Sequence, residues 1–189
     1  LICQRLAYGF IQNDVKVAYV TTELTTRGWL EQVGSIGYNM DNNIDDGKFL
    51  LISSFGVLAD EIEENVDILE VLNSPGVQEA QVIIIDRASQ LIPPDTNAKK
   101  LLSKIRKFNS QGRTVLLTID NHEVDSRLIR EMKNSAELVL DLETATIGGD
   151  TVRTIAVTRF LRAAGPTQGR IGWKVMPQMG FIVDITAVS

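Results

Sequence analysis

The sequence predicts an α/β fold with a central, mostly parallel sheet and antiparallel strands at its C-terminal edge. Three observations support this. Strand-like and helix-like segments alternate over about the first 135 residues. One strand, Gln81 to Asp86, is apolar on both faces, as a central parallel strand is. Beyond about residue 135 come segments in which apolar and polar residues alternate, broken by hairpin-like turns, and these are typical of an antiparallel meander.

Composition favours one domain over residues 1–189. The chain is 44% hydrophobic with a formal net charge of -5, and this length can bury a core without disulfides or metal. Cys3 and His122 are the only cysteine and histidine, which excludes an intramolecular disulfide and a Cys/His zinc site. No apolar run approaches the ~18 residues of a membrane-spanning helix. The acidic balance argues against non-specific coating of nucleic acid. Because the chain has a single cysteine, we expect a cytoplasmic protein.

The helices are predicted from apolar residues at intervals of three or four. Ile2, Leu6 and Phe10 recur in this way in the first helix. In the third predicted helix, over residues 60–72, Val66 is expected to point toward the core. The periodicity predicts helices over residues 1–12, 25–36, 60–72, 96–109 and 126–133.

The parallel strands are predicted from runs of β-branched and aromatic residues. These runs cover residues 15–22, 48–54, 81–86 and 113–119, the last as another buried strand. A polar loop is expected over residues 41–47. In the C-terminal part, apolar residues alternate from Leu138, Ile155, Ile171 and Phe181, with turns at 148–150 and 177–180.

Polar residues end three of the predicted parallel strands. Glu23 follows the first, Asp86 ends the third, and Thr118 and Asn121 end the fourth. Ligands of open α/β sheets bind beyond the carboxyl ends of the strands. We therefore expect these side chains to converge on one site.

Asp86 ends a segment with the form of a Walker B strand. Four apolar residues, Val82 to Ile85, precede it and would carry its carboxylate to the strand tip. An Mg²⁺ ion that carries phosphates needs only one or two protein carboxylates, often through water. An aspartate at a strand end is also a common helix cap or turn former. The residues alone leave both interpretations open.

Glu23, Thr118 and Asn121 have candidate catalytic roles. Glu23 near a terminal phosphate could accept the proton of an attacking water, and Thr118 or Asn121 could sense the γ-phosphate or orient that water. The alternative for Glu23 is an electrostatic cap of the next helix, with Thr22 or Thr25 as N-cap. The alternative for Thr118 and Asn121 is turn chemistry.

A phosphate-binding loop is missing from these residues. No GxxxxGK[ST] motif occurs in the chain, although P-loop chemistry needs its backbone amides and lysine. Either the protein uses no such loop or the loop lies ahead of Leu1. The second expectation accounts for a first helix with no strand ahead of it.

Five segments carry a family resemblance. They are LICQRLAYGF, VAYVTTEL, VIIIDRASQL, GRTVLLTIDNH, and VTRFLRAAG followed by WKVMPQMGFIVDI. They are similar, in order, to the helix after Walker A, the strand ending in a catalytic glutamate, Walker B, the sensor strand and the C-terminal strands of RecA-type ATPases of the KaiC-like group. Within that group they resemble the accessory ATPases of the archaellum motor, the FlaH or ArlH family.

The resemblance implies a RecA-like three-layer sandwich that binds ATP and Mg²⁺, with Asp86 meeting the metal through water. It also implies a hexameric ring with slow or absent hydrolysis. The implied partners are the motor ATPase FlaI and the ring protein FlaX, at the cytoplasmic face of the membrane. This protein would regulate or scaffold the motor.

The resemblance also implies contacts between neighbouring subunits. KaiC-like proteins carry a lysine and an arginine near the chain end that reach the neighbour's nucleotide. Arg159 stands in the lysine position, while Leu161 stands in the arginine position with Arg162 beside it. Arg87 stands where a serine or threonine usually follows the aspartate.

Other functions stay open at this level. One is a KaiC-like ATPase or kinase with true turnover, and another is a RadA-like DNA recombinase, which the acidic balance disfavours. A degenerate domain that binds no nucleotide and serves only in interactions is a third. The acidic third helix and the basic fourth helix fit either two solvated faces or complementary docking surfaces.

Overall fold

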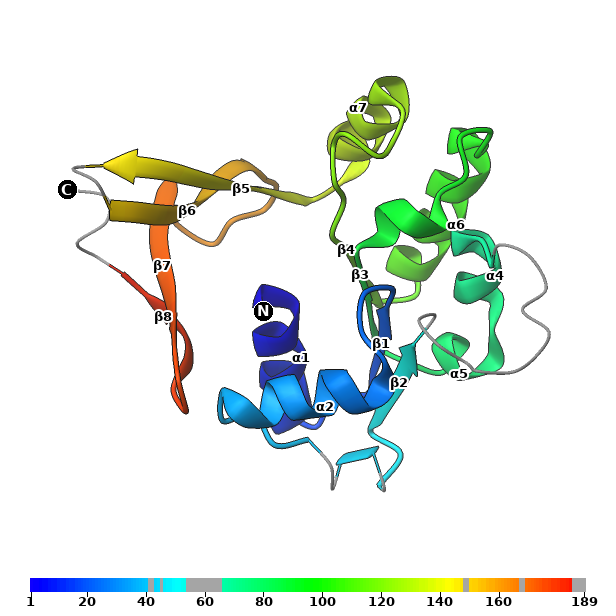
Figure 1. Ribbon diagram of the computed structural model, residues 1–189. Coiled ribbons are helices and arrows are strands. Elements are labelled where there is room, and N and C mark those ends of the chain that lie inside the picture. Colours follow the sequence, from blue (N-terminus) through cyan, green and yellow to red (C-terminus); the bar gives the residue numbers. More distant parts are fainter. Residues whose placement is uncertain (41–42, 45, 54–65, 148–149, 167–168, 185–189) are drawn as a thin grey trace.

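The computed structural model describes residues 1–40, 43, 44, 46–53, 66–147, 150–166 and 169–184. Two four-stranded sheets organise this part of the chain (Figure 1). The first consists of β1 (Val17–Thr21), β2 (Phe49–Ser53), β3 (Val82–Asp86) and β4 (Thr114–Leu117). All its neighbours run parallel, in the order β2-β1-β3-β4. The predicted α/β class and the central position of the Gln81–Asp86 strand are confirmed.

Helices cover both faces of the parallel sheet, which gives three layers (Figure 1). Val17 and Tyr19 of β1 pack toward one layer of helices, and Ala18 and Val20 toward the other. Every residue of β1 is buried, as a strand sandwiched between two helical layers must be. The first layer holds α1 (Ile2–Gln12) and α2 (Thr26–Ser35), and the second holds α4 (Ile68–Asn73), α5 (Pro75–Gln78), α6 (Ala98–Ser110) and α7 (Ser126–Ser135).

Side-chain caps fix where several of these helices begin. The Thr25 hydroxyl accepts a hydrogen bond from the Gly28 amide at the start of α2. Asn97 and Asp125 cap α6 and α7 in the same manner. Such caps satisfy amides that have no partner within the helix.

Within the described residues, the helix expected over residues 60–72 does not run through Asp67. Residues 60–65 lie outside the described part of the chain, but α4 starts at Ile68. Asp67 and Glu70 form a capping box there, which holds Asp67 in an extended conformation and ends any helix that would run through it. Val66, expected to point inward, is 48% exposed.

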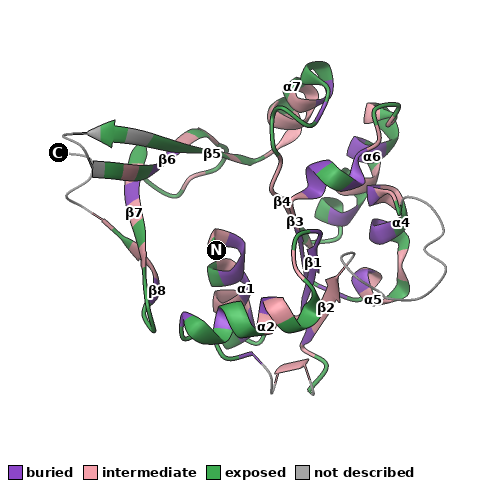
Figure 2. Ribbon diagram, viewed as in Figure 1, coloured by how far each residue is buried: buried purple, intermediate pink, exposed green. Residues whose placement is uncertain are grey.

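The C-terminal strands form a sheet of their own rather than edges of the first. These are β5 (Leu138–Ile147), β6 (Asp150–Phe160), β7 (Arg170–Met176) and β8 (Gly180–Val183), antiparallel in chain order. The predicted meander is thus confirmed, but β4 is an edge strand. For that reason Val115, Leu116 and Leu117 are only half-buried, whereas a buried strand was predicted (Figure 2).

Tyr38, just after α2, joins the second sheet to helix α1. Its hydroxyl accepts a hydrogen bond of 2.7 Å from the Phe181 amide, and its ring stacks on Tyr8 of α1 with centroids 5.0 Å apart. Gly180 has a φ of +70°, and a Cβ there would come within 2.1 Å of the Tyr38 oxygen. The β7–β8 turn therefore needs glycine at this position for two reasons, its backbone conformation and the close approach.

In the part of the chain that the structure describes, none of the helices has the length and apolar character needed to cross a bilayer.

Candidate functional site

The parallel register brings the ends of three strands together. Thr21 of β1 lies opposite Asp86 of β3, and Ile85 lies opposite Leu117 of β4. Thr118 follows directly, and its hydroxyl donates to Asp86 Oδ1 at 2.8 Å. The register therefore brings Asp86 and Thr118 together at the carboxyl ends of the strands, as predicted.

Tyr19 completes what we call the strand-tip cluster: Asp86, Thr118 and Tyr19. The Tyr19 hydroxyl donates to Asp86 Oδ2 at 2.5 Å, so each carboxylate oxygen accepts one hydroxyl hydrogen bond. The Tyr19 side chain is buried, and burial together with the nearby Asp86 charge raises its pKa. Tyr19 is therefore a hydrogen-bond donor at all ordinary pH values.

Cys3 brings the start of α1 to the same cluster. It is 2% exposed, and burial, followed by the Asp86 charge and a hydrogen bond to Asp86, raises the pKa of its thiol to about 12. The thiol is protonated near neutral pH. Since Cys3 lies in the first turn of α1, the N-terminus of this helix points toward the strand tips.

Glu23 belongs to a second group beside the strand-tip cluster, which we call the Arg87 bridge: Glu23, Arg87 and Glu123. Arg87 Nη1 pairs with Glu23, and Nη2 lies 2.6 Å from Glu123 Oε1. The hydroxyl of buried Ser89 donates to the other Glu123 oxygen at 2.6 Å. Hydrogen bonds from Arg87 and then Ser89 lower the pKa of Glu123, and those with Glu123 and then Glu23 raise the pKa of Arg87.

The backbone of Arg87 is fixed on both sides. Its φ and ψ are 59° and 52°, a left-handed conformation that costs a non-glycine residue about 1–2 kcal/mol. Its amide donates to the Thr118 hydroxyl at 2.6 Å, and its carbonyl accepts from the Thr22 hydroxyl at 3.2 Å. Contacts from the ends of β1 and β4 thus hold Arg87 in this conformation.

Three predicted site residues lie apart from these contacts. Asn121 is exposed in the turn after β4. Arg159, on β6, donates to the Ala136 carbonyl at 2.7 Å, and Arg162 pairs with Glu137. These arginines contact the α7–β5 connection, so the described residues do not join them to the strand-tip cluster.

The sequence prediction missed Tyr19, Ser89 and Glu123 and noted Arg87 only as a departure from a pattern. One signal was available for Tyr19, because a tyrosine inside an apolar strand needs a partner for its hydroxyl. Glu123 lacked such a signal, since its role depends on how the loop after β4 folds back toward Ser89.

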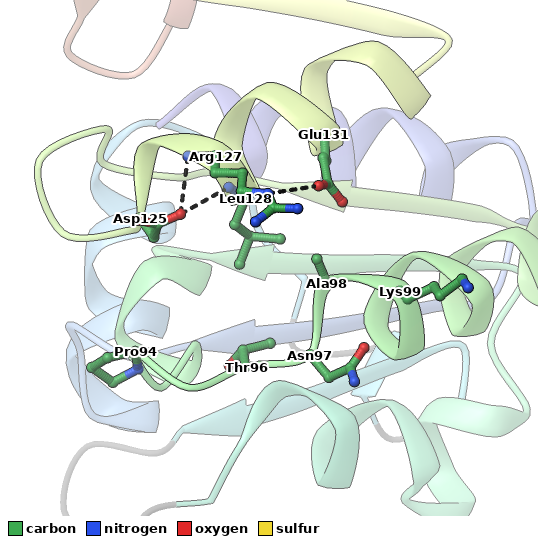
Figure 3. A pocket seen from close by; sticks show the side chains of 9 residues that line it. All are labelled: Pro94, Thr96, Asn97, Ala98, Lys99, Asp125, Arg127, Leu128 and Glu131. Carbon is green, nitrogen blue, oxygen red and sulfur yellow. Dashed lines mark hydrogen bonds and ion pairs between the residues drawn. The ribbon is translucent and has the colours of Figure 1, made fainter.

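A surface pocket of about 460 Å³ lies elsewhere, between the starts of α6 and α7 (Figure 3). Part of its polar lining is engaged locally: Asp125 accepts from the Arg127 and Leu128 amides, and Arg127 pairs with Glu131. None of the predicted site residues lines it. The strand tips are therefore the stronger candidate site.

The strand-tip cluster fits Mg²⁺ held through water. Asp86 supplies a carboxylate with about four lone-pair sites. Thr118, Tyr19 and Cys3 use three of them, which leaves one for a metal-bound water. Oxygen donors of this kind suit a hard cation that keeps several waters. Within the described residues, no three His, Cys, Asp or Glu side chains gather closely enough to hold a metal directly.

Comparisons with known proteins extend over the whole chain. No family model matches it. The archaeal flagellar ATP-binding protein FlaH of Methanocaldococcus jannaschii is 29% identical over 192 residues, covering 100% of this chain and 82% of that protein. FlaH of Methanococcus voltae is 26% identical, and FlaH of Sulfolobus acidocaldarius 24%, each covering 100% of this chain and 84% of the relative.

A solved structure agrees with these sequence matches. The crystal structure of the flagellar accessory protein FlaH from Methanocaldococcus jannaschii superposes with a TM-score of 0.89 at 29% identity, covering 97% of this chain and 83% of that one. This similarity supports the RecA-like interpretation of the α/β fold. In sequence and in fold, the chain is FlaH-like.

Proposed function

We propose that this protein is an ATP-binding component of the archaellum machinery that regulates or scaffolds the motor, with slow or no hydrolysis of its nucleotide. Its similarity to proteins named archaeal flagellar ATP-binding protein supports nucleotide binding and archaellum association. The regulatory role and the slow turnover are proposals drawn from the family resemblance.

One observation carries the nucleotide proposal: the carboxylate of Asp86 is fixed by Thr118 and Tyr19 where three parallel strands end. The start of α1 lies beside it, because Cys3 contacts Asp86. Amides at a helix N-terminus attract phosphate, and a carboxylate at a strand tip attracts the accompanying cation. The two features together suit a nucleotide's phosphates and their Mg²⁺.

Each residue of the site has a proposed task. Asp86 orients a water in the shell of Mg²⁺, and Tyr19 and Thr118 keep the carboxylate in place. When bound, Mg²⁺ neutralises charge on the phosphates. Glu23 is the candidate base for an attacking water. Thr118 accepts a hydrogen bond from the Arg87 amide and so connects the strand-tip cluster to the backbone of Arg87.

Binding of Mg²⁺-ATP to the full-length protein tests this proposal by isothermal titration calorimetry and by thermal unfolding. We expect saturable binding that raises the unfolding temperature and an affinity that falls at least about tenfold in Asp86→Asn. Asp14→Asn is the matched control, because Asp14 is an exposed carboxylate paired with Lys48 away from the strand tips. Absence of binding in the unaltered protein, or equal loss in both variants, contradicts the proposal.

The proposed role includes assembly into a ring of six subunits, which nucleotide binding itself does not need. Exposed apolar side chains favour an interface on the second sheet. They include Leu138, Leu140, Leu142, Phe160 and Leu161. Arg162 is the candidate for contacting the neighbour's nucleotide, with Arg159 beside it.

Native mass spectrometry with and without Mg²⁺-ATP tests assembly. The proposed partners are FlaI and FlaX, at the cytoplasmic face of the membrane, and co-purification with each of them tests this part of the proposal. We expect ATP to favour a hexamer and Arg162→Ala to weaken it. A monomer at all nucleotide concentrations would contradict the ring.

A true catalyst is the second candidate. The observation that favours it is Glu23, whose side chain is 51% exposed beside the strand-tip cluster and so within reach of solvent. Steady phosphate release that Glu23→Gln abolishes would support catalysis over scaffolding. Stimulation of that release by DNA would instead support a recombinase.

A further inference from the structure

We propose that Arg87 is a positioning residue that restrains Glu23, so that hydrolysis at this site is slow until the Arg87 bridge opens. This inference rests on the proposed nucleotide site and adds a means of regulating it.

The side chain of Arg87 is shared between two carboxylates. Nη1 pairs with Glu23 and Nη2 with Glu123 at 2.6 Å, so the two ends of one planar guanidinium are occupied at once. Ser89, which is 4% exposed, fixes the second Glu123 oxygen at 2.6 Å. Glu123 is thus anchored to buried structure, and through Arg87 it anchors Glu23.

The backbone of Arg87 adds to this restraint. Its amide and carbonyl are held by Thr118 and Thr22, and the following amide, of Ala88, donates to the Thr118 carbonyl at 2.8 Å. Arg87 therefore cannot move far without disturbing the ends of β1 and β4. The restraint on Glu23 is coupled to the same threonine that binds Asp86.

The pairing of Glu23 with Arg87 affects the proton transfer that hydrolysis requires. In hydrolysis, the water oxygen forms a bond to the γ-phosphorus, the bond from that phosphorus to the β–γ bridging oxygen breaks, and ADP leaves with the electron pair. The water proton passes to the base, here Glu23. In the Arg87 bridge, Glu23 Oε1 is occupied by Arg87 Nη1 and the carboxylate is held toward the guanidinium. Glu23 must leave Arg87, at least in part, to act.

Two other roles for Arg87 make different predictions. If the guanidinium only ties the strand ends together, its removal lowers stability without raising turnover. If it contacts the transferred phosphate as a cationic stabiliser, its removal lowers turnover. The restraint predicts the opposite direction, a gain of activity on loss of a charged side chain.

The test compares Arg87→Ser with the unaltered full-length protein by steady-state phosphate release from Mg²⁺-ATP. We expect kcat to rise roughly 10- to 100-fold with KM nearly unchanged, and the rise to vanish in Arg87→Ser combined with Glu23→Gln. Arg87→Lys, which can still pair with Glu23, should restore slow turnover. Glu123→Gln should give a smaller rise that is not additive with Arg87→Ser.

Lys16→Ser is the matched control. Lys16 forms a 2.8 Å ion pair with Glu79 at similar exposure, just before β1 and so at the opposite end of the sheet. Its removal should leave kcat unchanged. Should Arg87→Ser unfold the protein, Arg87→Gln, which keeps most of the side chain, serves in its place.

Binding of Mg²⁺-ATP, measured on the same samples by calorimetry, separates the two levels of the proposal. If neither the unaltered protein nor Arg87→Ser binds ATP, the proposed nucleotide site is wrong. If both bind and kcat is unchanged or falls, the nucleotide site stands and the restraint by Arg87 is wrong. A rise in kcat that persists without Glu23 also overturns the restraint.

Discussion

The two sheets bury their apolar residues to different degrees. All five residues of β1 in the parallel sheet are buried, because helices cover both of its faces. On β5 of the antiparallel sheet, Leu138, Leu140 and Leu142 are 46%, 38% and 56% exposed. Figure 2 shows the same contrast between the buried central strands and the largely exposed β5.

This difference shows that an alternating pattern predicts which face of a strand is apolar, but it does not predict whether another element covers that face. The leucines of β5 alternate as regularly as residues of a buried sheet face, yet none of them belongs to a buried core cluster of the described residues. Burial stabilises in proportion to the apolar area removed from water. The stability of the protein should therefore depend mainly on the parallel sheet, and the antiparallel sheet should contribute mainly where Tyr38 docks its last hairpin.

The largest expected effect comes from the parallel sheet. Ile84 of β3 is fully buried against the α1 and α2 layer. Ile84→Ala should lower the free energy of unfolding by about 4 kcal/mol, because it removes buried area and leaves a cavity. Chemical denaturation measures the free energy of unfolding. A loss below about 1 kcal/mol would mean that the helical layers do not exclude water from the sheet.

Alkaline pH should weaken the same region. The thiol of Cys3 has an ordinary pKa of 9.0, raised to about 12 in the folded protein mainly by burial. Between these values the unfolded chain loses the proton while the folded protein keeps it, so stability falls as pH rises. We expect a loss of up to about 3 kcal/mol from pH 9 to pH 11. The raised pKa of Tyr19 acts in the same direction above pH 10.

Cys3→Ala provides the comparison for this measurement. Denaturation curves at several pH values should show a shallower decline for the variant between pH 9 and pH 11, since the titrating thiol is gone. An identical decline in both proteins would show that Cys3 is not the group responsible.

The docking hairpin of the antiparallel sheet should give an intermediate effect. Gly180→Ala forces a side chain into a φ of +70° and against Tyr38, and it displaces the acceptor of the Phe181 amide. We expect a loss of about 2 kcal/mol. Gly112→Ala is the control, because its φ is +75° but nothing lies within 4 Å of the new Cβ, so it should cost only about 1 kcal/mol. Equal losses would mean that the contact with Tyr38 contributes nothing.

Particular elements show how far sequence alone could lead. The apolar run before Asp86 predicted a central strand, and the polar residues at strand ends predicted that Asp86 and Thr118 meet, because both features are local. The separation of the sheets and the half-buried state of β4 were not predictable in this way, since they depend on which strand edges pair. The Arg87 bridge was missed because the position of Glu123 depends on tertiary contacts with Ser89.

The smallest effect on the folded subunit should come from the exposed face of β5. Leu142 is 56% exposed, so Leu142→Ser removes little buried area and should change the free energy of unfolding by less than about 0.5 kcal/mol. If this face is an interface between subunits, the same change should weaken assembly measured by native mass spectrometry, although the subunit itself is nearly as stable as before. A large loss of subunit stability would instead mean that Leu142 is covered within one chain, and the contrast between the two sheets would then be smaller than their exposures indicate.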